Sequence, residues 1–376
     1  MKLSKESSFF HMGRHLLPFF LITFGMVMGV LLSLHTSTPY TVHLIPHYSS
    51  NPIAVSKNPV PPPTYPKAEE VAKPTNAMHN MTDEELMWQA SMVSHVRQYP
   101  YSRVPKVAFM YLTRGPMPLG PLWERFFKGQ NGLYSIYVHC PPSYTVEAPP
   151  DSVFFRRKVP SKVVEWGRAT MIDAERRLLA NALLDFSNER FVLLSESCIP
   201  LFNFTTAYSY LINSHHCFVG SFDDPRHCGR GRYNKTMAPE ILLSEWRKGS
   251  QWFEVNRALA IEIVSDTKYY AIFREHCNPP CYMDEHYLPT FVTKNFPSSN
   301  SNRSFMWVDW SRGGSHPATF RSGDATERFL NQIRNSENCT YNGNPTSICF
   351  LFARKWAPNA LQPLLRIAPR VLGLPL

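Results

Sequence analysis

The sequence predicts an α/β domain with a central, mostly parallel sheet, preceded by a transmembrane helix and an extended proline-rich segment. Three observations lead to this prediction. An uncharged apolar run stands near the N-terminus, residues 39–74 contain nine prolines, and short apolar runs then alternate with helical patterns. Such alternation is typical of parallel sheets covered by helices. We therefore expect one folded domain at residues 81–376, after a non-globular N-terminal part.

The first expected element is the apolar run at residues 16–34, whose 19 residues carry no charge. An α-helix needs about 20 apolar residues to cross the core of a bilayer. Three basic residues precede the run, and the next one after it is Lys57. Because basic residues stay on the cytosolic side, we expect a cytosolic tail at 1–15 and the remaining chain in the secretory lumen. A cleaved signal peptide is the alternative, and it leads to the same compartment.

Glycosylation sequons and cysteines agree with a luminal domain. Asn-x-Ser/Thr sequons begin at Asn80, Asn203, Asn234, Asn302 and Asn338. All eight cysteines also lie beyond the apolar run, which suits disulfides in an oxidising lumen, and the sequence does not assign their pairing. Cys277 and Cys281 have the spacing of half a zinc site, but no second pair completes four ligands.

The proline-rich segment at residues 35–80 is expected to be an extended stem, because it shows little apolar periodicity. Thr82 follows it and stands three residues before Glu85, which is the pattern of a capping box at the start of a helix. The folded domain is therefore expected to begin with a helix near residue 82.

Strands are expected at residues 106–113, 133–139, 190–195, 217–222, 305–309 and 347–352. Helices are expected at residues 122–129, 168–186, 205–213, 254–265, 284–293 and 325–335. Ligands of such sheets bind at the carboxyl ends of strands, so a site is expected beyond Thr113, His139 and Ser195. No glycine-rich dinucleotide or phosphate loop follows these strands, which disfavours a dehydrogenase or a kinase.

The composition limits the classes of ligand. A net charge of +10 and an aromatic content of 13% favour anionic ligands, such as nucleotide-linked sugars. The Lys and Arg residues are scattered and form no block interleaved with aromatic residues. This distribution argues against a nucleic-acid-binding protein.

Five motifs occur in one order along the chain. They are Trp166-Gly167, Phe-Val-Leu-Leu-Ser-Glu-Ser-Cys-Ile-Pro at 191–200, Lys-Gly-Ser-Gln-Trp-Phe at 248–253, Asp284-Glu285-His286, and Phe-Ala-Arg-Lys-Trp at 352–356. Together they resemble the plant branch of the core-2/I-branching β-1,6-N-acetylglucosaminyltransferase family, over about residues 105–365. The resemblance implies a GT-A-like fold in a single-pass type II Golgi membrane protein with a luminal catalytic domain. It also implies transfer from a UDP-sugar to a glycan or glycoprotein, with inversion and without a metal or other cofactor.

Inverting transfer needs a carboxylate that takes the proton of the acceptor hydroxyl. Asp284 and Glu285 open a predicted helix, where an acidic pair can also serve only to complement the helix dipole. By the resemblance, Glu285 falls on the catalytic base of the family. Asp284 is then expected to remain a helix-terminal charge.

The leaving diphosphate needs compensating positive charge. Lys355 follows the apolar run at 347–352, and by the resemblance it matches the diphosphate-binding lysine of the family. The family's partner arginine maps to Arg334, with Arg321 as the second choice. These cations are expected to replace a metal ion.

Acceptor contacts are expected from two further segments. Two tryptophans and two cations between Trp246 and Trp252 suit stacking on sugar rings, although core packing of the indoles is the alternative. The resemblance places Ser250 and Trp252 beside the acceptor, and it loosely matches Arg232 and Asp223 to acceptor contacts. Asp223 and the adjacent aspartate form no Asp-x-Asp metal motif, so no metal site is expected.

Two positions depart from the animal members of the family. The strand that ends at His139 lacks their nucleoside-binding aspartate, and Glu196-Ser197 replaces a pattern of small residues. The donor sugar is therefore left open, whereas a base and a diphosphate clamp are retained. Two alternatives stay open: a non-catalytic, membrane-tethered carbohydrate-binding or scaffold protein, and a glycoside hydrolase, which would need a second carboxylate to pair with Glu285.

Overall fold

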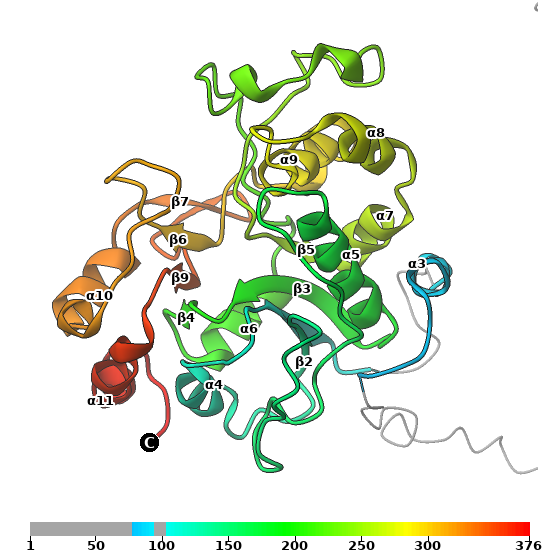
Figure 1. Cartoon of the computed structure of the whole chain (residues 1–376). Helices are drawn as coiled ribbons and strands as arrows, with labels where there is room; N and C mark the ends of the chain where they lie inside the picture. Colours follow the sequence, from blue (N-terminus) through cyan, green and yellow to red (C-terminus); the bar gives the residue numbers. More distant parts are fainter. Residues whose placement is uncertain (1–76, 94–102) are drawn as a thin grey trace, which may run out of the picture. The chain divides into compact units, whose positions relative to one another are not determined.

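A computed structural model describes residues 77–93 and 103–376 of the chain (Figure 1). The chain divides into two units, Met1–Thr64 and Tyr65–Leu376, and every described residue belongs to the second. The expected cytosolic tail, the expected membrane span and most of the expected stem lie outside the described residues. Within the described ranges, no helix is both long enough and apolar enough to cross a membrane.

The main sheet has the strand order β2-β1-β3-β5. Its strands are β1 (Lys106–Leu112), β2 (Tyr134–His139), β3 (Asn188–Ser195) and β5 (Glu254–Asn256). β1 runs parallel to both β2 and β3, and β5 is antiparallel to β3. The five residues from Val107 to Tyr111 are all buried, as in strands covered on both faces by helices. This mostly parallel sheet confirms the α/β prediction.

Helices cover both faces of this sheet, with α5 on one side and α4 and α6 on the other (Figure 1). The α-helices are α3 (Asp83–Ser91), α4 (Gly120–Phe127), α5 (Thr170–Leu183), α6 (Phe204–Ile212), α7 (Arg257–Ser265), α8 (Lys268–His276), α9 (Met283–Asn295), α10 (Glu327–Arg334) and α11 (Leu361–Val371). The 3₁₀-helices are η1 (Arg230–Arg232), η2 (Lys235–Met237), η3 (Pro297–Ser299), η4 (Ser322–Asp324) and η5 (Pro358–Ala360). Thr82 and Glu85 form the expected capping box at the start of α3.

A second, smaller sheet has the order β4-β9-β6. It consists of β4 (Ile199–Pro200), β9 (Phe352–Arg354) and β6 (Met306–Val308). β9 is parallel to β6 and antiparallel to β4. A separate hairpin of β7 (Cys339–Tyr341) and β8 (Asn344–Thr346) is tied down by the disulfide Cys339–Cys349. β9 ends one residue before Lys355, so this sheet carries one wall of the site described below.

Three expected elements differ from the structure. Residues 217–222 form isolated bridges at Cys217, Phe218 and Phe222 in place of a continuous strand. The helix expected at 254–265 is instead strand β5 followed by α7, because the side chain of Asn256 caps the helix by accepting from the backbone N–H of Leu259. The strand expected at 347–352 becomes regular only at its last residue, where β9 begins.

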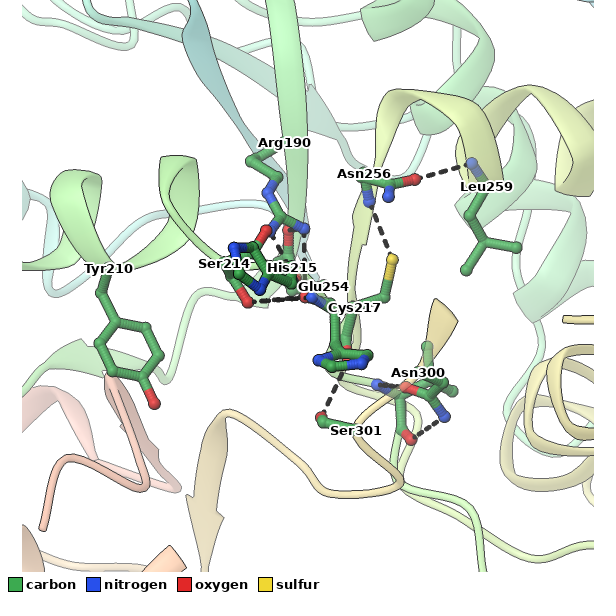
Figure 2. A network of polar contacts seen from close by, with 12 residues as sticks. Arg190, Tyr210, Ser214, His215, Cys217, Glu254, Asn256, Leu259, Asn300 and Ser301 are labelled. Atoms are coloured by element: carbon green, nitrogen blue, oxygen red, sulfur yellow. Dashed lines mark hydrogen bonds and ion pairs between the residues drawn. The ribbon is translucent and has the colours of Figure 1, made fainter. Parts of the chain in front are cut away.

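A buried polar network joins β3 to the segments beside it (Figure 2). Arg190 of β3 pairs with Glu254 of β5 at 3.1 Å and donates to the carbonyl oxygen of Ser214 at 2.5 Å. The Sγ atom of Cys217 accepts from the backbone N–H of Asn256 at 3.3 Å. Burial raises the pKa of Glu254 to about 7, which the positive charge of Arg190 opposes. The network anchors β3, whose other end reaches the cavity.

Candidate active site

A cavity of about 1220 Å³ opens at the carboxyl ends of the three parallel strands. Its lining includes Thr113 after β1, His139 at the end of β2 and Ser195 at the end of β3. The N-terminal turn of α9 closes the cavity with Asp284 and Glu285. The cavity therefore lies where the strand order led us to expect a ligand site.

Glu285 lies in the first turn of α9 and carries two ion pairs. Its Oε2 atom is 2.6 Å from Nη1 of Arg232 and 2.9 Å from Nζ of Lys248. Burial raises the pKa of Glu285, but the charges and hydrogen bonds of Lys248 and Arg232 outweigh it, so the net shift is downward. Glu285 is therefore held as a carboxylate. Both cations bind Oε2, and Oε1 makes no hydrogen bond with the described residues.

Asp284 lies in the first turn of α9, as expected for a helix-terminal residue, but it is buried. Its side chain lines the cavity, but the residue is only 8% exposed, and Oδ1 has no hydrogen-bond partner among the described residues. Burial, and next the negative charge of Glu285, raise the pKa of Asp284 to about 7. Asp284 is thus a buried carboxyl group at the edge of the cavity, in the first turn of α9.

Arg232 connects Glu285 to an aromatic cluster. Its guanidinium lies 4.5 Å from the ring centre of Tyr282, which in turn lies 5.0 Å from that of Trp166. Tyr282 has a left-handed backbone conformation, and it directly follows the disulfide Cys277–Cys281. Trp166 also lies 5.4 Å from the ring centre of His316, but it is 55% exposed and lines the cavity, so part of the indole is accessible to a ligand.

The segment that contains Ser250 and Trp252 also lines the cavity. The hydroxyl of Ser250 accepts from the backbone N–H of Trp252 at 3.2 Å. Trp252 is buried, and the guanidinium of Arg354 stacks 4.2 Å from its ring centre. Both expected acceptor-side residues thus reach the cavity, and Trp252 supports a cation as well.

Lys355 lines the cavity directly after β9, together with Arg354 and Arg114. Burial lowers the pKa of Lys355, and so do the positive charges of Arg354 and Arg114, whereas Glu196 opposes the shift. Like charges are thus crowded on one wall, and an anionic ligand would relieve their repulsion. Arg114 and Arg354 were not predicted from the sequence as members of this wall, although Arg114 follows β1 and Arg354 belongs to the motif at 352–356.

Arg334 does not join this wall, which corrects the expectation for the diphosphate site. It ends α10, donates to the carbonyl oxygen of Val371 at 2.5 Å and stacks 4.3 Å from the ring centre of Phe202. The second choice, Arg321, is exposed at the start of η4 and also lies outside the cavity. Neither arginine therefore lies on the cavity wall beside Lys355.

Asp223 also lies outside the cavity lining, so the acceptor role expected for it is not supported by its position. It is exposed and pairs with Arg230. The neighbouring Asp224 is buried, and its carboxylate binds Arg226 at 2.7 Å. Within the described residues, no group of three or more His, Cys, Asp or Glu side chains is arranged to hold a metal ion.

His139 ends β2 and lines the cavity. Its Nε2 atom is 3.0 Å from Nη1 of Arg177 and 3.3 Å from the backbone nitrogen of Lys162. Arg177 is in turn held by the carboxylate of Asp83, at 2.8 and 2.7 Å. The first helix of the domain, α3, is thereby linked to the wall of the cavity.

The expected glycosylation sites differ in accessibility. Asn80, Asn302 and Asn338 are exposed. Asn203 is partly buried and caps α6, and Asn234 is partly buried with its side-chain nitrogen donating to the carbonyl oxygen of His276. Of the eight cysteines, four form the disulfides Cys277–Cys281 and Cys339–Cys349, and the other four are free thiols in the described structure.

Comparison with known proteins assigns the chain to a family. Residues 107–334 match the family described as Core-2/I-Branching enzyme. The chain is also 36% identical over 309 residues to glycosyltransferase BC10 of Oryza sativa subsp. japonica, with 70% of this chain and 76% of that protein covered. The cavity at the strand ends, with its carboxylate and its wall of cations, is in keeping with this relationship. The chain is a glycosyltransferase that belongs to the Core-2/I-branching enzyme family.

Proposed function

We propose that this glycosyltransferase moves a sugar from a UDP-sugar to a glycan or glycoprotein acceptor, with inversion at the anomeric carbon. The observation that carries the proposal is that one cavity holds an ionised carboxylate, Glu285, and a separate wall of cations around Lys355. A displacement reaction needs these two groups, one for the attacking oxygen and one for the leaving group.

In the proposed reaction, the acceptor hydroxyl oxygen attacks the anomeric carbon and its proton passes to Oε1 of Glu285. The bond between the anomeric carbon and the phosphate oxygen breaks, and its electron pair leaves with UDP. Inversion follows because attack and departure occur on opposite faces of the sugar. Arg232 and Lys248 keep Glu285 ionised and oriented through Oε2.

The diphosphate is proposed to lie against Lys355, Arg354 and Arg114. Fixed cations of this kind can stabilise the developing negative charge on UDP, so the proposal requires no metal ion or other cofactor. The stacking of Arg354 on Trp252 restricts the guanidinium to one orientation, which preorganises the wall before the ligand arrives.

The acceptor is proposed to enter past Trp166, Tyr282 and Ser250. Exposed aromatic faces stack on the apolar faces of pyranose rings, and neighbouring hydroxyls and cations bind sugar hydroxyls. For the whole protein we propose a single-pass type II orientation in the Golgi membrane, with a cytosolic tail and a luminal catalytic domain. The support for this is the apolar run at 16–34 and its preceding basic residues.

A direct test is to incubate the purified full-length protein with a panel of UDP-sugars and to measure protection against thermal unfolding. A ligand that binds only the folded state raises the unfolding temperature, so the panel identifies the sugar donor. Release of UDP in the presence of glycan acceptors then tests turnover. Binding without transfer to any acceptor would favour the alternative of a non-catalytic binding protein.

A further inference from the structure

His139 is a nearly inaccessible side chain at the edge of the main sheet that still lines the cavity. It is the last residue of β2, the outer strand, and it is 1% exposed. The cations proposed to bind the diphosphate follow β1 and β9. His139 therefore lies to the side of the phosphate wall, where the nucleoside part of a sugar nucleotide would extend.

The contacts of Nε2 fix the tautomer of the ring. Nη1 of Arg177 and the backbone N–H of Lys162 both contact Nε2, at 3.0 and 3.3 Å. Guanidinium and amide N–H groups only donate hydrogen bonds, so Nε2 must accept and the proton of the neutral ring must be on Nδ1. Burial, and next the charge of Arg177, lower the pKa of His139 to about 3. The ring is therefore neutral at physiological pH.

The other ring nitrogen is the group that remains for a ligand. Within residues 77–93 and 103–376, Nδ1 of His139 has no hydrogen-bond partner. Nδ1 is not one of the fully buried side-chain polar atoms that lack a hydrogen-bond partner. Because His139 lines the cavity, it offers the cavity one uncharged N–H donor of fixed position.

Residues from three parts of the chain hold His139 and Arg177 in contact. Asp83 of α3 binds Arg177 of α5 through two hydrogen bonds, at 2.8 and 2.7 Å. The Nζ atom of Lys162 lies 2.6 Å from the same carboxylate, and its backbone N–H contacts His139. Arg177 is buried, so its guanidinium cannot turn into solvent and release the ring.

The cavity wall next to His139 is apolar. Pro141 and Pro142 follow it in the chain, and Val163 and Val164 follow Lys162, and all four line the cavity. Val163 is 68% exposed, so its side chain is accessible to a ligand. Apolar side chains beside a neutral donor suit a flat, uncharged heterocycle with a carbonyl group better than a phosphate or a free carboxylate.

We propose that the Nδ1–H of His139 donates a hydrogen bond to a carbonyl oxygen of the pyrimidine base of the sugar nucleotide, and that Arg177 and Asp83 are positioning residues that hold this donor in place. The inference rests on the proposed function, because it assumes a nucleotide in the cavity. It adds the recognition of the base, and it makes α3 part of the nucleotide site. Adenine has no carbonyl group, so the contact would favour uracil over adenine.

A matched pair of variants tests the contact. In His139→Gln, the side-chain amide can still accept from Arg177 at the position of Nε2, but the donor at the position of Nδ1 is lost. In His139→Asn, the amide nitrogen takes the position of Nδ1 and the donor is kept. Titration of the full-length protein with UDP, 2′-deoxy-UDP and ADP should show UDP bound more tightly than ADP. His139→Gln should weaken UDP binding by about 3- to 10-fold and bring the affinities for UDP and ADP closer together. His139→Asn should weaken UDP binding less.

The positioning role has its own readout. Nitrogen NMR of the wild-type protein with labelled histidine should show His139 as the Nδ1–H tautomer from pH 5 to 8. Arg177→Met removes a positive charge and a donor to Nε2, so the pKa of His139 should rise, although burial still lowers it, and the share of the Nδ1–H tautomer in the NMR signal should fall. A role of Arg177 in stability alone would change neither the pKa nor the tautomer.

The outcomes separate this inference from the proposed function. Three results would overturn the inference and leave the proposed function in place. They are equal binding of UDP and ADP by the wild-type protein, an Nε2–H tautomer of His139, and normal UDP binding by His139→Gln. If the wild-type protein lost more affinity with 2′-deoxy-UDP than with ADP, the contact would be with the ribose, and the inference would also be overturned. If no nucleotide binds the wild-type protein, both proposals fall. The tautomer and the wild-type UDP-to-ADP ratio need no variant, so misfolding of His139→Gln would not decide the matter.

Discussion

Lys248 Nζ lies 2.9 Å from Oε2 of Glu285, so the carboxylate proposed as the base is paired with a cation before any substrate is bound. Arg232 shares the same oxygen at 2.6 Å. The paired oxygen is unavailable to the acceptor, and the pairing keeps the group ionised at low pH. Glu285 is therefore already deprotonated when the acceptor binds, but it is a weaker base than an unpaired carboxylate would be.

The first prediction concerns the base. Glu285→Gln keeps the shape of the side chain but removes the proton acceptor, so turnover should fall by roughly 10²- to 10⁴-fold while UDP binding barely changes. The measurement is UDP release at saturating sugar donor. Asp284→Asn is the necessary control, because Asp284 also lines the cavity with a raised pKa of about 7. Loss of transfer in Asp284→Asn with normal transfer in Glu285→Gln would assign the base to Asp284.

The second prediction concerns pH. A base works only when deprotonated, so activity falls as the pH drops through its pKa. Lys248 and Arg232 hold the pKa of Glu285 below its ordinary value, which extends activity toward acid pH. Lys248→Met should raise that pKa and move the acid limb of the kcat/KM profile upward by about one pH unit. An unchanged acid limb in the folded variant would mean that another group titrates.

The third prediction distinguishes the two mapped cations. Lys355→Ala should lower kcat/KM by roughly 10²-fold and weaken UDP binding, because a charge near the leaving group is lost. Arg334→Ala should leave UDP binding unchanged but lower the free energy of unfolding by about 1–2 kcal/mol, since it loses the contacts with Val371 and Phe202. Isothermal titration and thermal unfolding measure the two effects. The reverse pattern would restore Arg334 to the nucleotide site.

The fourth prediction concerns metal ions. Transfer should persist in excess chelator, because the positive charge opposite the diphosphate is expected from side chains. The assay is UDP release with and without chelator, after dialysis against it. Abolition by the chelator and recovery with Mn²⁺ would show that Lys355, Arg354 and Arg114 are insufficient.

The fifth prediction concerns topology. In intact microsomes, the domain at 81–376 should resist added protease and should lose mass on enzymatic deglycosylation. Within this domain, Asn302 and Asn338 are the preferred sites, because both are exposed, whereas Asn203 and Asn234 are partly buried; the exposed Asn80 directly precedes the domain. Protease sensitivity without glycosylation would contradict both the luminal placement and the type II orientation.

The sequence predicted the strands and helices whose pattern is set locally. β1, β2 and β3 are apolar runs with clear ends, and α3 carries its own capping box. It missed β5, because a strand of three residues passes directly into α7 and its pairing with β3 is a long-range contact. It also missed α8 and α11, the second of which contains a proline within the helix.

Site residues could be predicted from the sequence where they stand close to the end of a strand or a helix, because that end determines their position. Glu285 and Lys355 follow such ends closely, and both reach the cavity. Arg334 could not be placed, because the loops between β6 and β9 decide which way α10 faces. The burial of Asp284 and the contact of Arg177 with His139 depend on side chains far apart in the sequence, for which one sequence carries no signal.

The wall formed by Lys355, Arg354 and Arg114 has a kinetic consequence. Charges that are part of the protein cannot depart with the product, as a bound metal ion can. If they stabilise UDP as it leaves the sugar, they also retain it afterwards, and nucleotide departure then limits turnover more than bond breaking does. Accumulated UDP would inhibit such an enzyme strongly. Its rate in the cell would follow the activity of the phosphatase that clears UDP from the compartment, as well as the supply of sugar nucleotide.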